Sequence, residues 1–425
     1  MKVLLVLHNH PSIRPGGSES YALGLYEAMR ASPKFDPVLV ARIGPDIATA
    51  RSPHPGAPFS TVNADPNQYF FFTEEAHYDF LFMTLREKSR YTRHFASFLR
   101  AQNPDVVHFQ HTFFMGVDLV TLTRSVLPEV PIVYTLHEYL PICHRMGQML
   151  RTNGELCLEA SPRRCGECFP DIPPQNFFLR ERFVKAAFEH VDVFLAPSRF
   201  LLERYVDWGI PREKIRFEDY GRVQEPRLPE NPEVRPRNRL AFFGQANPYK
   251  GMQVVLGAMA ILRRERPDIH LWLHAANLQY QSPEWKEEFG ALVERAGESV
   301  TFTGSYDHAA IPAMMADTDW VIVPSLWWEN SPLVIQEAFM HGRPVICSGI
   351  GGMAEKVTDG VNGLHFQVAD PGSLANTIRR GVDTEGLWDH LRSGIPPVFG
   401  IEEHLANLDE LYGDLVRERH PEPVG

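Results

Sequence analysis

The feature of this chain that most constrains its fold is a repeated alternation of short apolar runs with longer amphipathic segments. In the first half of the sequence, the short apolar runs lie at Val3–Leu7, Val106–Phe109, Ile132–Leu136 and Val193–Ala196. The amphipathic segments between them lie at Gly17–Arg30, Arg86–Gln102 and Ser198–Trp208. Apolar runs of this length are typical of strands buried on both faces, and amphipathic segments are typical of helices. The pattern therefore predicts a parallel sheet with helices on both of its faces.

The same alternation restarts after residues 224–238, a segment with four prolines and six charged residues that predicts a linker. The apolar runs beyond it lie at Leu240–Phe243, Ile269–Leu273, Val300–Phe302, Trp320–Val323 and Pro344–Cys347. The predicted helices lie at Met252–Arg264, Pro332–His341 and Pro371–Arg380. We therefore predict an α/β fold of two doubly wound, Rossmann-like domains, residues 1–223 and 239–398, that face a central cleft. A final helix within residues 399–425 is expected to cross back to the first domain.

The composition of the chain agrees with two ordinary globular domains and argues against one class of partner. With 425 residues, of which 44% are hydrophobic and 22% charged, the chain can bury two cores without disulfides. Its formal net charge of −11 argues against a nucleic-acid binder. The run Val3–Leu7 is too short for a secretory signal, and no stretch approaches the roughly 18 apolar residues that span a bilayer. We expect a cytoplasmic protein, soluble or bound peripherally to the inner face of the membrane.

The most specific stretch of the sequence is Pro324–Glu355, which reads PSLWWENSPLVIQEAFMHGRPVICSGIGGMAE. Within it, Ser331 followed by Pro332 predicts a helix start with serine as the N-cap. The unpaired backbone N–H groups and the dipole of such a helix start can bind an anion such as a diphosphate. Glu329 and Glu337 flank this start. Because carboxylates repel phosphate, we interpret both as hydrogen-bond acceptors for hydroxyl groups on either side of a diphosphate.

With seven residues between Glu329 and Glu337, this stretch resembles the E-x7-E signature of the retaining GT-B glycosyltransferases of family four (glycosyl transferases group 1). Other segments that resemble the same family are Gly16-Gly17-Ser18-Glu19, DVVHFQH at Asp105–His111, TLHE at Thr135–Glu138, APSRF at Ala196–Phe200, and DGVNGLHF at Asp359–Phe366. The resemblance extends over nearly the whole chain. It implies a GT-B fold and transfer of a sugar, with retention of configuration, from a nucleotide-diphosphate sugar of unknown base to a glycan, lipid-linked or small-molecule acceptor.

The resemblance also implies roles for individual residues. Glu337 is expected to bind the ribose hydroxyls, Glu329 a hydroxyl of the donor sugar, and Lys250 the leaving diphosphate. His137 is expected to contact the transferred sugar through its carbonyl or its imidazole, so Glu329, Lys250 and His137 are the predicted catalytic residues. The predicted donor-binding residues are Gly16, Gly17, Gln245, Lys250, Glu329, Asn330, Ser331, Pro332, Leu333, Val334 and Glu337. No catalytic metal is required if Lys250 and the helix dipole stabilise the departing charge.

One position departs from the family pattern. Gln245, in the segment FGQANPYKG, stands where the family usually has an arginine. A charged contact of this kind is typically worth about 1.5–3 kcal/mol, so its loss weakens the stabilisation of a diphosphate. Either another cation such as Arg199 or Arg222 substitutes, or the enzyme works with Lys250 alone. The alternatives to a transferase are an epimerase-like enzyme on the same fold and a sugar-nucleotide-binding protein without turnover.

Four of the five cysteines lie close together in the sequence, at Cys143, Cys157, Cys165 and Cys168. The segment around them, about residues 140–170, predicts a long loop inserted into the first domain, which needs a functional or covalent reason to be ordered. Four thiolates on a structural zinc ion would supply that reason, and an iron–sulfur cluster uses the same ligands. Unligated thiols or disulfides are the alternatives. Cys347 lies in a predicted strand and is interpreted as a buried thiol.

The acceptor side is defined less sharply. Asn67–Phe82 is rich in aromatic residues, and Arg86–Arg100 carries basic ones. They predict either an acceptor-binding or membrane-facing surface, as in family members that act on lipid-linked sugars, or a helix with an ordinary core face and a solvated face. A polyprenyl-linked glycan, a small metabolite and a protein all stay open as acceptors.

Overall fold

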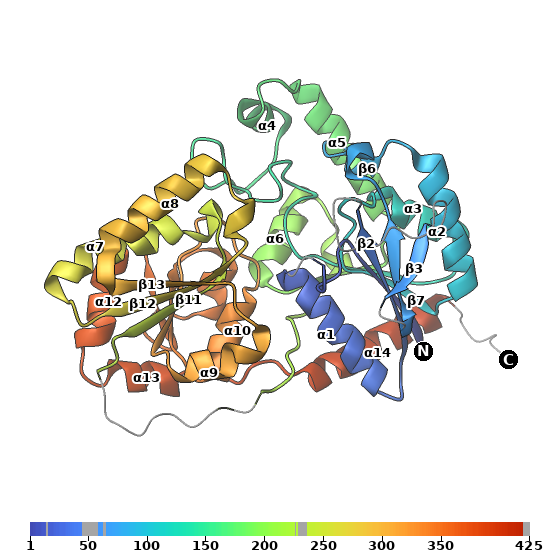
Figure 1. The fold of residues 1–425 in the computed structure, drawn as a ribbon. Coiled ribbons are helices and arrows are strands. Elements are labelled where there is room, and N and C mark those ends of the chain that lie inside the picture. Colours follow the sequence, from blue (N-terminus) through green and yellow to red (C-terminus); the bar gives the residue numbers. More distant parts are fainter. Residues whose placement is uncertain (14–15, 45–57, 63–64, 226, 228–235, 420–425) are drawn as a thin grey trace. The chain divides into compact units, whose positions relative to one another are not determined.

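The structure, a computed structural model, describes residues 1–13, 16–44, 58–62, 65–225, 227 and 236–419. The chain divides into two compact units, the first comprising Met1–Val223 with Phe399–Gly425 and the second Gln224–Val398. In each unit a mainly parallel sheet carries helices on both faces (Figure 1). Residues 226 and 228–235 of the predicted linker, and residues 420–425 of the predicted C-terminal segment, lie outside the described residues.

The main sheet of the first unit contains eight strands within the described residues. These strands are β1 (Lys2–Leu7), β2 (Asp36–Ile43), β3 (Phe59–Val62), β4 (Asp65–Phe72), β7 (Val106–Phe109), β8 (Ile132–Thr135), β9 (Val193–Ala196) and β10 (Ile215–Phe217). Their spatial order is β10-β9-β8-β7-β1-β2-β4-β3, and every neighbouring pair is parallel except β3 with β4. A separate antiparallel pair joins β5 (Tyr78–Asp79) to β6 (Thr84–Leu85). Because the order of the strands reverses between β1 and β7, the topological switch point of this sheet lies there.

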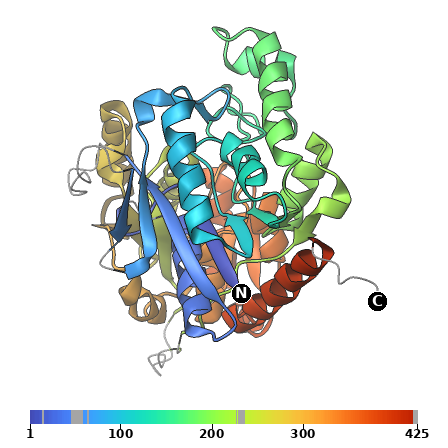
Figure 2. The same cartoon turned by 90° about the vertical axis from the view of Figure 1, so that its right-hand side faces the viewer.

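The helices of the first unit include one from the far end of the chain. They are α1 (Gly17–Ala31), α2 (Lys88–Gln102), α3 (Asp118–Val126), α4 (Pro162–Cys168), α5 (Pro174–Phe188), α6 (Arg199–Trp208) and α14 (Ile401–Arg419). The C-terminal α14 packs beside α1 (Figures 1 and 2). There Lys34 pairs with Asp409 at 2.6 Å, and the ring of Phe35 meets that of Tyr412 edge-on. The last helix therefore contributes to the core of the first unit.

The sheet of the second unit has six strands, all parallel, within the described residues. They are β11 (Arg239–Gln245), β12 (His270–Ala276), β13 (Val300–Gly304), β14 (Trp320–Val323), β15 (Val345–Ser348) and β16 (Gly363–Phe366). Their spatial order is β13-β12-β11-β14-β15-β16. The order reverses between β11 and β14, so the switch point of this sheet lies at their carboxyl ends.

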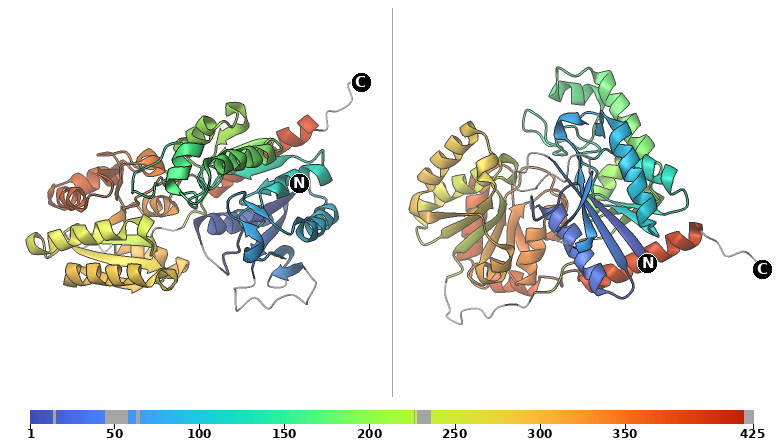
Figure 3. Two further views of the ribbon diagram at one scale, coloured as in Figure 1. Left: turned by 90° about the horizontal axis from the view of Figure 1, so that it is seen from above. Right: turned by 45° about the vertical axis from the view of Figure 1, so that its right-hand side comes forward.

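The helices of the second unit cover both faces of its sheet. They are α7 (Met252–Glu265), α8 (Pro283–Ala296), α9 (Ile311–Ala316), α10 (Leu333–Met340), α11 (Gly351–Lys356), α12 (Pro371–Asp383) and α13 (Leu387–Ser393). Alternate residues of β11 point to opposite faces: Phe242 joins a core with α7, α8 and α12, and Phe243 joins a core with α9, α10 and α11. Figures 1 and 3 show α7 and α8 along the first of these faces.

The predicted fold class, an α/β fold of two doubly wound units, is confirmed. The predicted strands and helices recur with ends that differ by a few residues. The strands β2, β3, β4 and β10 were not predicted, and only β3 and β10 among them lie at an edge of the sheet. Two details were wrong. The helix after β14 begins at Leu333 with Pro332 as its N-cap, one residue later than predicted. Residues 140–170 are not a plain loop, because Ser161 accepts a hydrogen bond from the N–H of Arg164 and starts α4.

Candidate functional site

Two of the predicted catalytic residues meet at the switch point of the second unit. Lys250 closes a 3-10 helix, η3 (Pro248–Lys250), directly after β11, and Glu329 lies in the loop that leads from β14 to α10. The Nζ of Lys250 lies 2.6 Å from Oε1 of Glu329. The same oxygen accepts hydrogen bonds from the hydroxyl of Ser325 at 2.7 Å and from Nε1 of Trp327 at 2.9 Å. The Glu329 side chain is 8% exposed, so its charge is compensated by these donors rather than by water.

Two glycines fix the backbone around this pair. Gly251 has a φ of 72°, and a Cβ there would lie 1.8 Å from the carbonyl oxygen of Pro324. The turn that carries Lys250 can therefore approach the Pro324 loop only with glycine at this position. On the other side, the N–H of Gly352 donates to the carbonyl of Glu329 at 2.8 Å, and a Cβ on Gly352 would lie 1.5 Å from the carbonyl oxygen of Asn330. The first turn of α11 thus braces the backbone of Glu329 and Asn330.

Glu337 lies in α10 with a partner that the sequence did not indicate. Its carboxylate faces Nε2 of His308 at 3.2 Å, and the Glu337 side chain is 10% exposed. His308 begins η6 (His308–Ala310), which Asp307 caps through the N–H of Ala309. Burial and the charge of Glu337 raise the pKa of the nearby Tyr306. No pattern in the sequence links residues 308 and 337, because their meeting depends on the packing of η6 beside α10.

The remaining donor-binding residues predicted in the second unit occupy the same strand ends. Asn330, Ser331 and Pro332 are buried in the loop before α10. Leu333 and Val334 are the first residues of α10, and N–H groups in a first helical turn lack intrahelical partners. Gln245 is the last residue of β11, opposite Ala276 of β12.

The cations considered as substitutes for an arginine at position 245, Arg199 and Arg222, both belong to the first unit. The guanidinium of Arg199 lies 4.6 Å from the centre of the Phe217 ring, within reach of a cation–π contact.

His137, in the first unit, uses both ring nitrogens within the protein. Its Nε2 lies 2.9 Å from the amide oxygen of Gln110, which can only accept, and its Nδ1 lies 2.6 Å from the hydroxyl of Tyr220. Burial, reinforced by His111, lowers the pKa of His137 well below its ordinary value, so the ring is neutral at pH 7. Of the two contacts predicted for His137, the carbonyl is therefore the one that the ring geometry favours.

Gly16 and Gly17 lie at the start of α1, and the space beside Gly16 is occupied by the side chain of Glu19. Gly16 is the N-cap, and a Cβ there would lie 2.4 Å from Oε2 of Glu19. The Glu19 side chain folds back over the helix start, as a glutamate at the third helical position can do. The carboxylate then reaches Nε2 of His8 at 3.0 Å. Glycine at position 16 thus makes room for a carboxylate, a role that the sequence reading missed.

The expectation that the four clustered cysteines hold a zinc ion or an iron–sulfur cluster is not supported. Cys143, Cys157, Cys165 and Cys168 line one small pocket of about 30 Å³, with room for roughly one water molecule. All are free thiols, and in the part of the chain that the structure describes no group of three or more His, Cys, Asp or Glu is arranged to hold a metal ion. The Cys157 thiol donates instead to the carbonyl of Glu159 at 3.0 Å.

Burial raises the pKa of the Cys143 thiol, and it raises the pKa of Cys165 to about 11. The helix α4 and its contact with α5 give this segment regular structure. Cys347 is buried, as predicted.

The aromatic segment before α2 is divided between the core and the surface. Phe71 is fully buried and meets the rings of Phe59 and Phe95, and Tyr78 is also buried, while Phe80 is exposed. The helix α2 buries Phe95 and Phe98 and leaves its basic residues on the outer face. Among the described helices, none is both long and apolar enough to cross a membrane.

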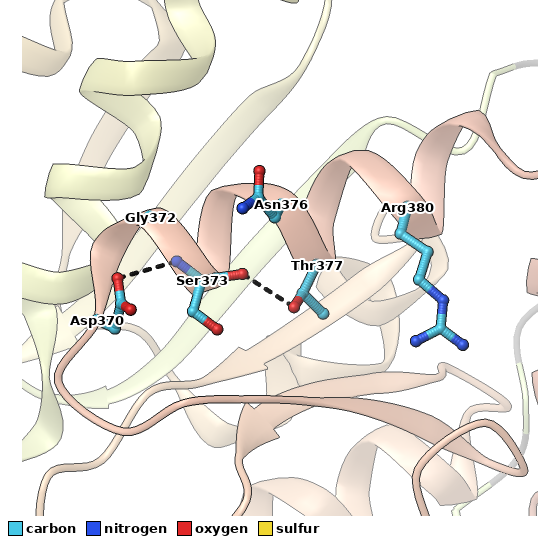
Figure 4. Close-up of a pocket in the computed structure, with 6 residues that line it drawn as sticks. All are labelled: Asp370, Gly372, Ser373, Asn376, Thr377 and Arg380. Atoms are coloured by element: carbon cyan, nitrogen blue, oxygen red, sulfur yellow. Dashed lines mark hydrogen bonds between the residues drawn. The ribbon is translucent and has the colours of Figure 1, made fainter.

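An open pocket on α12 lies apart from the predicted site (Figure 4). It is lined by Asp370, Gly372, Ser373, Asn376, Thr377 and Arg380. Asp370 caps the helix by accepting the N–H of Ser373 at 2.9 Å, and the Thr377 hydroxyl donates to the carbonyl of Ser373 at 2.9 Å. The groups drawn in Figure 4 thus mainly stabilise the helix itself, and none is a predicted site residue.

Comparison with known protein families finds a match for each unit. Residues 16–221 match a glycosyl transferase 4-like domain, and residues 237–383 match the glycosyl transferases group 1. A D-inositol 3-phosphate glycosyltransferase of Arthrobacter sp. (strain FB24) is 24% identical over 378 residues, which cover 85% of this chain and 81% of that protein.

Comparison with solved structures finds the same two-unit fold. The HepE protein of Anabaena in complex with UDP and glucose superposes with a TM-score of 0.68 at 17% identity, over 97% of this chain and all of that one. Sucrose-phosphate synthase from Thermosynechococcus elongatus gives 0.71 at 18% identity, over 98% of this chain and all of that one. At these identities the likeness establishes the GT-B fold alone.

Proposed function

Because each unit matches a glycosyl transferase family model and the chain has the GT-B fold, we propose that it transfers a sugar, with retention of configuration, from a nucleotide-diphosphate sugar to a hydroxyl group of an acceptor. The observation that carries the proposal lies at the switch point of the second unit. There Lys250 pairs with the buried Glu329 immediately before a helix start, and a second buried carboxylate, Glu337, lies within the same helix.

Each group at this helix start has a proposed partner in the donor. Glu337 accepts hydrogen bonds from the ribose hydroxyls, and Glu329 accepts one from a hydroxyl of the sugar. The N–H groups at Ser331, Leu333 and Val334 bind the diphosphate, which the helix dipole favours. In the reaction the bond from the sugar's C1 to the diphosphate oxygen breaks and a bond from C1 to the acceptor oxygen forms. The acceptor's proton leaves with the diphosphate, whose charge Lys250 offsets.

The Lys250–Glu329 pair suits both roles. Oε1 of Glu329 accepts three hydrogen bonds from the protein, which hold the carboxylate in one orientation. Oε2 is the oxygen that we assign to the sugar hydroxyl. A held carboxylate positions the sugar without having to reorganise during the reaction, which is the source of most electrostatic catalysis. For His137 we propose that its carbonyl contacts the transferred sugar.

The first property to determine is which nucleotide the chain binds. UDP is the first to test, because the similar HepE protein was solved with UDP. We expect calorimetric titration with UDP, GDP, ADP, CMP and dTDP to give clear binding of one nucleotide. Glu337→Ala is expected to weaken that binding about tenfold or more, by loss of hydrogen bonds to a charged group. Glu287→Ala, which removes an exposed carboxylate of α8, serves as the matched control.

Failure of every nucleotide to bind, or equal binding by wild type and Glu337→Ala, would contradict the proposed donor site. Binding without release of nucleoside diphosphate from any sugar nucleotide, with or without acceptors, would favour a sugar-nucleotide-binding protein. Interconversion of the free sugar nucleotide, without transfer, would favour an epimerase-like enzyme.

A further inference from the structure

His8 and Glu19 form a buried pair at the switch point of the first unit. His8 directly follows β1, and only 9% of it is exposed. Its Nε2 lies 3.0 Å from Oε1 of Glu19, and the hydroxyl of Ser18 donates to Oε2 of Glu19 at 2.9 Å. The pair therefore lies where a doubly wound sheet binds its ligands, beyond the carboxyl end of a strand at the point of reversal.

The ionised Glu19 carboxylate favours the tautomer of His8 that carries its ring proton on Nε2. Burial by itself would raise the pKa of Glu19, but the attraction and hydrogen bond of His8, together with Ser18, lower it to about 2. Burial, reinforced by His111, lowers the pKa of His8, while Glu19 and Glu138 act in the opposite direction. At pH 7 the carboxylate is thus ionised and the imidazole neutral. A neutral ring that donates Nε2–H to a carboxylate carries a bare lone pair on Nδ1.

That lone pair has no hydrogen-bond partner among the residues that the structure describes, although the atom is buried. The neighbouring rings do not supply a donor. His111, whose ring centre lies 4.2 Å away, accepts the N–H of Phe113 on its own Nδ1 and faces Glu138 with Nε2 at 3.2 Å. Phe113, 6.1 Å away, is apolar. Since buried acceptors are normally satisfied, a donor from outside the chain is expected at this atom.

We propose that Nδ1 of His8 accepts a hydrogen bond from a hydroxyl group of the sugar acceptor, and that Glu19 holds the imidazole in the tautomer that this contact requires. The inference rests on the proposed function, because transfer supplies the hydroxyl-bearing substrate. His8 is then a binding residue and Glu19 a positioning residue. Gly16 is part of the same arrangement, because any side chain at this position would displace the Glu19 carboxylate.

Two amide substitutions separate this role from a structural one. In His8→Asn the side-chain oxygen lies near the position of Nδ1, whereas in His8→Gln the amide lies near the position of Nε2 and keeps the contact with Glu19. The acceptor probes are D-inositol 3-phosphate and a set of methyl hexosides, with the nucleotide sugar that the full chain binds as donor. Where none is accepted, water is the probe, and donor hydrolysis is compared in the same way.

We expect His8→Gln to raise the KM for the acceptor, or to lower the hydrolysis rate, about tenfold, which corresponds to one hydrogen bond of about 1.4 kcal/mol. His8→Asn should recover most of this loss, and neither variant should alter the Kd for the nucleotide. Nitrogen-resolved NMR of the histidine-labelled full chain should show His8 with Nε2 protonated, and a mixture of tautomers in Glu19→Gln.

The inference would be overturned if His8→Gln behaved as wild type and His8→Asn lost activity. That result would show that His8 only anchors Glu19. If both variants kept the wild-type KM or hydrolysis rate, with nucleotide binding intact, water alone would satisfy Nδ1, and the inference would also be overturned. If the wild-type chain bound no nucleotide, the proposed function itself would fail, and that outcome is distinct from the two above.

Discussion

The Nζ of Lys250 and Oε1 of Glu329 are 2.6 Å apart, which joins the residue expected at the leaving group to the residue expected at the sugar. The two are 79 positions apart in the sequence and follow different strands, β11 and β14. Their contact means that the charge offered to a diphosphate is already partly shared with a carboxylate. Changes at either residue are therefore expected to act on both sites.

Removing the charge of Lys250 is expected to reduce catalysis more than binding. In Lys250→Gln the departing diphosphate loses a cation, and Glu329 loses its ionic partner, so kcat should fall about 10- to 100-fold. Release of nucleoside diphosphate measures this rate. Lys286→Gln, which removes a lysine of α8 that donates to the carbonyl of Gln279, is the control. A fall of less than about twofold in Lys250→Gln would exclude a role for this lysine at the leaving group.

Restoring an arginine at position 245 tests whether Lys250 acts alone. Gln245 ends β11, the strand that leads to Lys250, so Gln245→Arg adds a second cation at the same strand end. We expect the Kd for the preferred nucleoside diphosphate to fall about tenfold at low salt and the gain to shrink as salt rises. Calorimetry at two ionic strengths checks both. An unchanged Kd would mean that another cation already fills this role.

The close approach at Gly251 predicts a large cost for a single methyl group. In Gly251→Ala the new Cβ would meet the carbonyl oxygen of Pro324 and would require a positive φ, so the free energy of unfolding should fall by about 2–4 kcal/mol. The matched control is Gly290→Ala in α8, where a Cβ meets nothing within 4 Å and helix propensity should raise stability by about 0.5–1 kcal/mol. Urea denaturation compares them; similar effects in both would contradict the described turn.

Acid should destabilise the first unit through its buried neutral histidines. Burial, reinforced by His404, lowers the pKa of His108 to about 3, while the unfolded chain takes up this proton near the ordinary pKa of 6.5. Because the unfolded state then binds more protons, stability falls as pH falls from 6.5 towards 3, by about 1.4 kcal/mol per pH unit for this group. His108→Gln should show a slope smaller by that amount in urea denaturation at several pH values.

The sequence by itself predicted many of the buried strands and the strand ends at which we propose the ligand site. Apolar runs such as Trp320–Val323 are buried wherever they lie, so their pattern is a local property that survives without knowledge of the fold. The carboxyl ends of such strands then point to Glu329, Glu337 and Lys250 as members of one site. Short edge strands such as β10 escaped prediction because a strand exposed on one side needs few apolar residues.

Only the tertiary structure decided which side chains pair with one another. Lys250 with Glu329, His308 with Glu337, and His8 with Glu19 are contacts between elements that the chain brings together from separate positions. Their distances depend on turns such as Gly251 and on the packing of neighbouring helices, and neither spacing nor residue type encodes them. The cysteines show the same limit, because their close spacing favours a metal site, whereas no group of three or more ligand side chains among the described residues is arranged to hold a metal ion. Residue type and periodicity are local, whereas protonation and pairing depend on three-dimensional surroundings.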